Sequence, residues 1–162
     1  MRYTDSELAD QIRIGDSTLI DGLKILFVCS GNTCRSPMAA AIAHKILGPS
    51  VYVESAGSHA HVRDPPSANA VKTIRDMFGV DISSHRSRSV CDVHIERFDY
   101  VVPLADNVRV DLEMSFPGLG ERLLPSWDID DPYQGDMFTY EVTATRILKH
   151  MEELSAFLKK RK

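Results

Sequence analysis

The sequence predicts a single-domain α/β protein in which helices cover both faces of a four-stranded parallel sheet. Two observations predict this class. Short apolar runs that are typical of buried strands alternate with longer helix-like segments along the chain. In addition, a chain of 162 residues has the usual size of one domain and can bury a substantial core.

Residues 1–22 precede the alternating pattern, so we interpret them as an N-terminal extension to a domain that spans residues 23–162. Within the extension, Thr4-Asp5-Ser6-Glu7 has the form of a capping box, which predicts a short helix that ends near Ile14. We expect this extension to take no part in catalysis.

Four strands and four helices are predicted within the domain. The strands cover residues 24–28, 51–54, 100–104 and 122–124, and the helices cover residues 35–47, 67–78, 107–114 and 138–160. Gly79 is placed to end the second helix, and Pro117-Gly118 marks a turn. A doubly wound sheet of this kind binds ligands beyond the carboxyl ends of its strands.

The segment between the first strand and the first helix is suited to bind a phosphate-sized anion. Backbone N–H groups of such a turn point inward, and the positive end of the helix dipole adds to them. Gly31 and Asn32 tolerate the positive φ that the turn needs. Arg35 can bind two phosphoryl oxygens at once, Cys29 supplies a nucleophile, and the Ser36 hydroxyl can donate to its thiolate. The segment reads Cys29-Ser30-Gly31-Asn32-Thr33-Cys34-Arg35-Ser36-Pro37.

An acidic segment further along the chain supplies carboxyl groups for acid–base chemistry. It reads Asp128-Ile129-Asp130-Asp131-Pro132-Tyr133. Expelling an alkoxide-like leaving group needs a proton, and hydrolysing the resulting phosphocysteine needs a base that takes a proton from water. One carboxyl group can serve both steps in turn.

The cysteine segment, from Phe27 to Ala39, closely resembles the signature of the low-molecular-weight protein tyrosine phosphatases, a family similar in fold to the thioredoxin-linked arsenate reductases. The resemblance covers roughly residues 23–162 and includes Ser55-Ala56-Gly57, Gly79-Val80-Asp81-Ile82-Ser83-Ser84-His85, Phe98-Asp99-Tyr100 and Asp131-Pro132-Tyr133. It implies a flavodoxin-like fold and hydrolysis of phosphotyrosine in a phosphorylated protein substrate. The reaction would pass through a phosphocysteine and would need no cofactor and no metal.

The resemblance also assigns roles to residues of this chain. Cys29 would attack phosphorus, Arg35 would hold the phosphoryl oxygens, and Asp131 would carry the proton. Cys34 would be able to capture an oxidised Cys29 as a disulfide. The substrate- and phosphate-binding residues would be Ser30, Gly31, Asn32, Thr33, Cys34, Ser36 and Tyr133, and the loop would be supported by Ser55 and His85.

Departures from the family pattern leave other functions open. Many members carry a Trp where this chain has His59-Ala60-His61, a histidine pair for which no third metal ligand is evident. Thr33 stands where phosphotyrosine enzymes often have Ile or Leu, and a Thr at this position resembles the protein arginine phosphatase branch. Arsenate reduction needs further cysteines, but Ala105 and Leu112 stand where they are expected, and Cys91 is the one spare thiol. A non-catalytic phosphate-binding module is the remaining alternative.

Composition limits the setting in which the protein works. A net charge of −4 argues against a nucleic-acid partner. Three cysteines without a secretory apolar segment favour a reducing, cytoplasmic location. No apolar stretch approaches the ~20 residues that cross a membrane, and no Gly-Lys-Ser or Gly-Lys-Thr indicates a Walker-type nucleotide loop. The sequence leaves the oligomeric state open.

Overall fold

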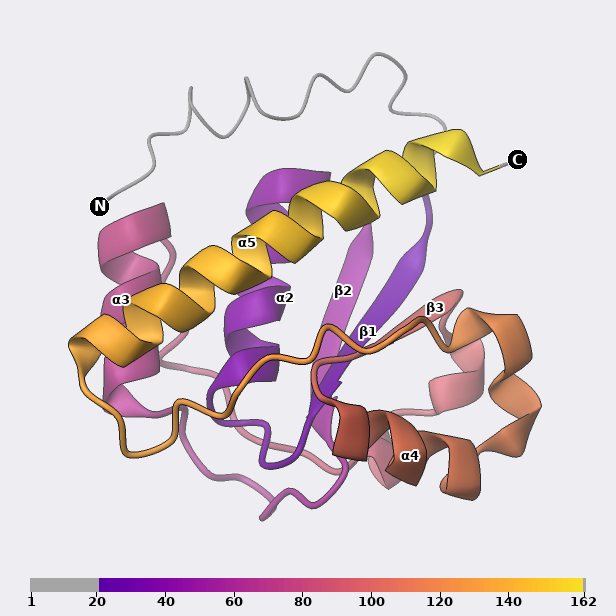
Figure 1. Ribbon diagram of the computed structural model, residues 1–162, viewed down its shortest axis with the longest axis horizontal. Helices are drawn as coiled ribbons and strands as arrows, with labels where there is room; N and C mark the ends of the chain where they lie inside the picture. Colours follow the sequence, from indigo (N-terminus) through magenta and orange to yellow (C-terminus); the bar gives the residue numbers. More distant parts are fainter. Residues whose placement is uncertain (1–20, 162) are drawn as a thin grey trace.

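The computed structural model describes residues 21–161, so the helix predicted near residues 4–14 lies outside the described residues. Three parallel strands form the sheet in the order β2-β1-β3 (Figure 1). They are β1 (Lys24–Cys29), β2 (Tyr52–Gly57) and β3 (Tyr100–Pro103). The central strand β1 pairs with β2 from Lys24 to Cys29, so Cys29 lies opposite Gly57 at the carboxyl end of the sheet.

The apolar run of β1 is continuous because both of its faces are covered. Ile25 and Phe27 point into one apolar cluster, and Leu26 and Val28 point into another. All four side chains are fully buried. A strand buried on both faces gains from an apolar residue at every position, which explains why the run lacks polar alternation.

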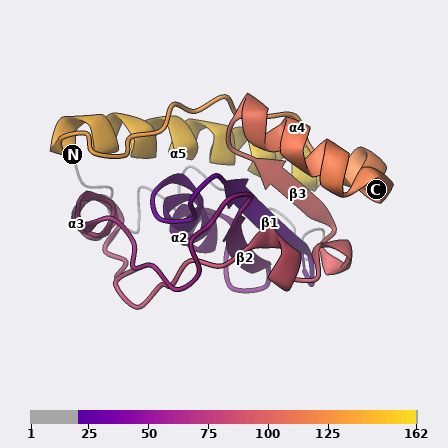
Figure 2. The same ribbon diagram turned by 90° about the horizontal axis from the view of Figure 1, so that it is seen from below.

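Helices cover both faces of the sheet, as predicted. On one face lie α2 (Arg35–Leu47), α3 (Ala68–Phe78) and α5 (Met137–Lys160), and α5 packs along α2 and α3 (Figures 1 and 2). On the other lie α4 (Asp106–Ser115) and the 3₁₀ helices η2 (Val90–Asp92), η3 (Ile95–Arg97) and η4 (Pro117–Arg122). Gly79 ends α3 in the left-handed conformation, with its N–H bonded to the Arg75 carbonyl.

The prediction of a fourth strand at residues 122–124 is wrong. Leu123 makes only an isolated bridge to Val101, and Arg122 belongs to η4. The chain does follow β3 further, because the N–H of Leu124 donates to the Val101 carbonyl. It does not form a regular strand, because Pro125 has no N–H to donate and Asp128 has a φ of 49°.

This irregular segment carries the chain from β3 to the acidic loop at the carboxyl end of the sheet. Trp127 and Ile129 donate backbone hydrogen bonds to the carbonyls of Pro103 and Leu104. The acidic segment is thereby fixed near the loop that follows β1.

None of the helices formed by residues 21–161 combines the length and the apolar character that a membrane span requires.

Candidate active site

The loop between β1 and α2 places a thiol at the floor of a pocket. Asn32, in the middle of this loop, has a φ of 58°, a conformation that asparagine tolerates better than most residues. The Cys29 sulfur lies 2.9 Å from the Ser36 Oγ and accepts the Asn32 N–H at 3.3 Å. The Asn32 amide donates to the same Ser36 oxygen at 2.7 Å, and the serine hydroxyl hydrogen has two acceptors in reach, the Ala56 carbonyl at 3.4 Å and, at the shorter distance of 2.9 Å, a Cys29 thiolate. Two donors at one sulfur stabilise a thiolate.

The side chain of Asn32 ties the loop to the rest of the fold. It is fully buried, its amide group donates to the Ser55 Oγ at 3.0 Å, and its carbonyl oxygen accepts the Arg88 N–H at 3.0 Å. The backbone carbonyl of Asn32 lies 2.8 Å from the His85 Nε2. Burial lowers the pKa of His85, so the neutral ring is favoured, and its Nε2–H donates to that carbonyl.

Gly57 allows β2 to approach the cysteine loop closely. A Cβ at this position would lie 2.5 Å from the Ser30 carbonyl oxygen and 3.1 Å from the Asn32 Cβ. The Ser58 N–H, one residue later, donates to the Cys29 carbonyl. Only glycine leaves enough space for this contact, which explains physically why the Ser55-Ala56-Gly57 segment ends in glycine.

Arg35 reaches from the start of α2 toward the acidic loop. It is buried, with 4% of its surface exposed, and one terminal nitrogen donates to the Ile129 carbonyl at 2.8 Å. The other terminal nitrogen lies 3.7 Å from an Asp131 carboxylate oxygen. The Arg35 Nε is buried and has no hydrogen-bond partner among residues 21–161. A buried N–H without a partner costs free energy, so an oxyanion that accepted it would be stabilised.

Asp131 faces this guanidinium from a half-exposed position, with 52% of its side chain accessible. One of its carboxylate oxygens accepts the Tyr133 N–H at 3.1 Å, which fixes the carboxyl group at the edge of the pocket. Tyr133 itself is exposed beside it. A carboxyl group in this position can exchange protons with a bound ligand and with water.

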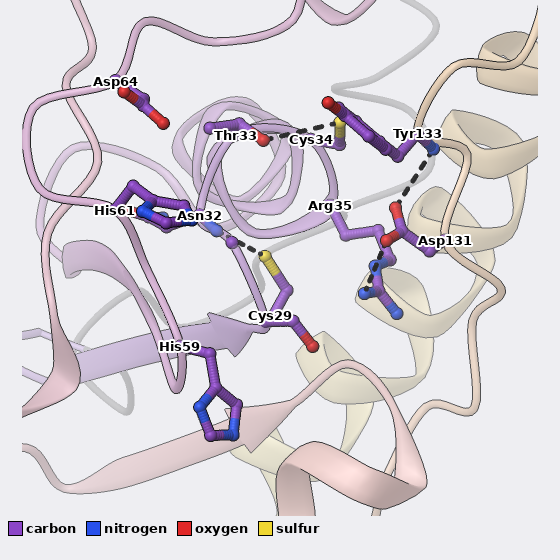
Figure 3. A pocket seen from close by; sticks show the side chains of 12 residues that line it. Cys29, Asn32, Thr33, Cys34, Arg35, His59, His61, Asp64, Asp131 and Tyr133 are labelled. Carbon is purple, nitrogen blue, oxygen red and sulfur yellow. Dashed lines mark hydrogen bonds and ion pairs between the residues drawn. The ribbon is translucent and has the colours of Figure 1, made fainter.

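The pocket has a volume of about 330 Å³, and Figure 3 shows how its side chains surround the Cys29 sulfur. The structure brings together in this pocket nine residues that the sequence singles out, namely Cys29, Ser30, Gly31, Asn32, Thr33, Cys34, Arg35, Asp131 and Tyr133. Ser36, Ser55 and His85 do not line it. They lie behind the loop and contact Cys29 or Asn32 instead.

Several residues near the pocket are not among the predicted site residues. Asp64 lines it together with His59 and His61, and the backbone of Arg88 donates to Asn32. Arg88 also donates to the Ser55 carbonyl and pairs with Glu54. No local motif marks Arg88, and the backbone N–H that it contributes carries no sequence signal.

Cys34 contacts two hydroxyl groups from segments distant in the sequence, neither of which is among the predicted site residues. Its sulfur lies 2.8 Å from the Ser67 Oγ and 3.3 Å from the Tyr140 hydroxyl. Burial and the contact with Cys34 raise the pKa of Tyr140 to about 12, so this hydroxyl keeps its proton. The end of the cysteine loop, at Cys34, is thereby held against α5 and against the residue that precedes α3.

The chain is similar to known proteins in both sequence and structure. Residues 24–162 match the family model described as low molecular weight phosphotyrosine protein phosphatase. The "Probable low molecular weight protein-tyrosine-phosphatase EpsP" of Ralstonia solanacearum is 36% identical over 124 residues, which cover 72% of this chain and 83% of that protein. "Arsenate reductase 2" of Staphylococcus epidermidis is 34% identical over 113 residues, or 70% and 81% of the two chains.

Solved structures agree on the fold. A low molecular weight protein tyrosine phosphatase from T. tengcongensis superposes with a TM-score of 0.77 at 31% identity, covering 84% of this chain and 99% of that one. The YwlE arginine phosphatase from Geobacillus stearothermophilus superposes with a TM-score of 0.77 at 29% identity, covering 85% and 93%. The relatives thus include three activities on one fold, and the fold does not choose between them.

Proposed function

Because the chain belongs to the low molecular weight phosphotyrosine protein phosphatase family, we propose that it is a cysteine-dependent protein phosphatase that hydrolyses phosphotyrosine. One observation carries this proposal. The Cys29 sulfur, with two hydrogen-bond donors, shares a pocket with a buried Arg35 that has an unpartnered Nε and with the Asp131 carboxyl group. These groups are what transfer of a phosphoryl group to a thiolate requires.

The reaction proceeds in two steps. The Cys29 thiolate attacks phosphorus while Arg35 and the loop N–H groups hold the phosphoryl oxygens. The bond from phosphorus to the tyrosyl oxygen breaks, and Asp131 gives that oxygen its proton. Water then attacks the phosphocysteine, the Asp131 carboxylate takes a proton from the water, and Cys29 leaves as a thiolate. Ser36 stabilises the departing sulfur, and inorganic phosphate is released.

A Cys29→Ser variant tests the nucleophile. Replacing the thiol should lower kcat for an aryl phosphate by about 10³-fold or more, while binding of phosphate or vanadate persists, because Arg35 and the loop N–H groups remain. Activity close to that of the parent protein would refute the mechanism. If the parent protein binds phosphotyrosyl peptides but hydrolyses neither them nor an aryl phosphate, the chain is a phosphate-binding module instead.

A second candidate substrate is phosphoarginine, and Thr33 favours it. The Thr33 hydroxyl lies in the pocket wall and, among residues 21–161, has only a distant contact, 3.8 Å, with the Cys34 sulfur. It can therefore accept a hydrogen bond from a guanidinium group, which an aliphatic side chain could not do. An arginine phosphatase is among the relatives that share the fold.

Matched phosphotyrosyl and phosphoarginyl peptides separate the two substrates. We expect the higher kcat/KM for the phosphotyrosyl peptide. A Thr33→Ile variant should lower kcat/KM for the phosphoarginyl peptide by about 10-fold or more relative to the phosphotyrosyl peptide, if Thr33 recognises the guanidinium. A parent protein that prefers phosphoarginine, and a variant that loses this preference, would assign the chain to arginine phosphatase activity.

Arsenate reduction has less support in the site. The positions where the resemblance places relay cysteines hold Ala105, at the start of α4, and Leu112, which is buried in the core on that face. Cys91, the remaining thiol besides Cys29 and Cys34, is exposed on η2. The chain thus lacks thiols at the places where an outward disulfide relay would need them.

A further inference from the structure

Asp64 lies in the wall of the pocket, on the loop between β2 and α3. Figure 3 shows it, with His61, on the side of the Cys29 sulfur away from Asp131 and Tyr133. A proton-carrying role is already proposed for Asp131, so a second carboxylate at the pocket has no part in the two chemical steps.

The backbone of Asp64 is fixed although the residue is exposed. Its N–H donates to the Ser87 Oγ at 2.8 Å, and its carbonyl accepts the Ser87 N–H at 2.9 Å. The Ser87 carbonyl in turn accepts the Arg63 N–H at 2.8 Å, and the Ser87 hydroxyl donates to the His61 carbonyl. Pro65 and Pro66 follow at once and restrict the chain further. The backbone that carries this carboxylate is therefore held in place at the pocket wall.

The carboxylate of Asp64 has no ion-pair or hydrogen-bond partner within residues 21–161. Arg63, the neighbouring residue in the chain, forms no ion pair with this carboxylate within the described residues, while Arg88 pairs with Glu54 and Arg86 donates to the carbonyls of Ser83 and His85. Arg35, the permanent cation that lines the pocket, is bound to Ile129 and lies close to Asp131. The Asp64 charge is thus available to a ligand.

An unpaired carboxylate beside an anion cradle lowers the affinity for any ligand that brings only negative charge. A fixed charge of this kind gives specificity, because it repels ligands of the same charge and attracts ligands of the opposite charge. We propose that Asp64 selects protein substrates that carry a lysine or arginine next to the phosphorylated residue, and disfavours those with acidic neighbours. The inference rests on the proposed phosphatase function and adds a specificity residue to it.

Phosphotyrosyl peptides that differ only at the two flanking positions test this role. With lysine at both positions, kcat/KM should exceed that of the glutamate-flanked peptide by at least about threefold at low ionic strength, mainly through KM. The Asp64→Asn variant should lower this lysine-to-glutamate ratio by about threefold, and Asp64→Lys should reverse the preference. The parent ratio should also shrink in high salt, because salt screens exposed charges.

The matched control is Asp76→Asn, which removes an exposed carboxylate on α3 that pairs with Arg75. This variant should keep the parent ratio. An Asp64→Asn protein with the parent ratio would overturn the inference while leaving the phosphatase function intact. If no peptide is hydrolysed, the proposed function fails instead. Dissociation constants of the two peptides for the parent and Asp64→Asn proteins then decide whether the charge preference exists.

Discussion

At the scale of single residues, Asn32 is the loop residue that makes hydrogen bonds both within the cysteine loop and to the segments behind it. Its amide group reaches Ser36 and Ser55, its side-chain oxygen accepts from Arg88, and its backbone bonds to the Cys29 sulfur and to His85. A nucleophile loop must hold its N–H groups in fixed positions to stabilise a transition state. In this chain, one buried amide group makes three of the hydrogen bonds that hold the loop.

Replacing Asn32 by alanine should therefore harm both folding and activity. The variant loses three side-chain hydrogen bonds and leaves the Arg88 N–H without a partner, and alanine adopts a φ of 58° less readily than asparagine. We expect the free energy of unfolding to fall by about 2–4 kcal/mol. We expect kcat/KM for an aryl phosphate to fall by about 10- to 100-fold. Urea unfolding and steady-state kinetics measure the two effects.

An Asn32→Gly variant separates the two causes, because glycine adopts positive φ freely but lacks the amide. Similar losses in both variants would show that the hydrogen-bond network matters most. If glycine restores activity to the parent level, backbone conformation is the decisive factor, and the network has no catalytic weight.

The residues of the loop could be predicted from the sequence, whereas part of their support could not. The order of Cys29, Arg35 and Ser36 along one turn already predicts the chemistry that we propose for the site. Arg88 is different, because it contributes a backbone N–H to Asn32 from 56 residues away along the chain. Any residue except proline could supply that donor, so its position emerges only when the fold brings the two segments together.

At the scale of elements, the end of β2 determines how closely the cysteine loop can pack. Gly57 is the last residue of β2 and lies opposite Cys29 in the ladder. After Gly57 the chain continues into the loop that carries His59, His61 and Asp64. Gly57 therefore lies between the cysteine loop and the side of the pocket that we propose to select substrates.

A Gly57→Ala variant should move the cysteine loop. The new Cβ would lie 2.5 Å from the Ser30 carbonyl oxygen and 2.8 Å from the Ala60 Cβ, and neither atom is the end of a flexible side chain that could move aside. A shift of about 1 Å at the donors should lower kcat/KM by about 100-fold while the protein stays folded. Circular dichroism and kinetics with an aryl phosphate measure the outcome. Gly118→Ala, where an added Cβ meets open space, is the control and should retain parent activity.

The elements themselves followed well from apolar pattern, except where local geometry interrupts pairing. The helix predicted at residues 35–47 is α2, which begins at Arg35 and ends at Leu47. The strand predicted at residues 122–124 fails because its first residue, Arg122, belongs to η4 and because Pro125 follows it. A short apolar run does not reveal whether its neighbours can continue a ladder, so runs of three residues are the hardest to assign.

At the scale of the whole molecule, two partly buried histidines make stability depend on pH. Burial lowers the pKa of His85, which supports Asn32, and of His150, which stacks on Trp127 at 5.2 Å between ring centroids. Near pH 6.5 the unfolded chain takes up protons at these positions while the folded protein resists them. Stability is therefore fully present above about pH 6.5 and is lost as the pH falls below this value.

Urea unfolding between pH 5 and 8 should show the free energy of unfolding falling on acidification, with a smaller slope in His85→Gln and in His150→Gln. Of the two variants, His85→Gln should also lower activity, because it changes a residue that supports the nucleophile loop. The window avoids Asp81 and Asp136, whose lowered pKa values affect stability only below about pH 3.8. Stability that is constant or rises on acidification would contradict this assignment.

The position of β1 at the centre of the sheet determines when the active site can form during folding. Both of its partner strands come later in the chain, and the cysteine loop needs Arg88 and the Ile129 carbonyl as anchors. These contacts span up to 94 residues, and the loop-closure entropy must be paid before such non-local contacts stabilise the chain, so we expect them to form late in assembly. A ribosome-bound chain that ends before Ile129 thus carries the whole cysteine motif but not its acidic partner. Recovery of enzymatic activity will report completion of folding, rather than formation of its first elements.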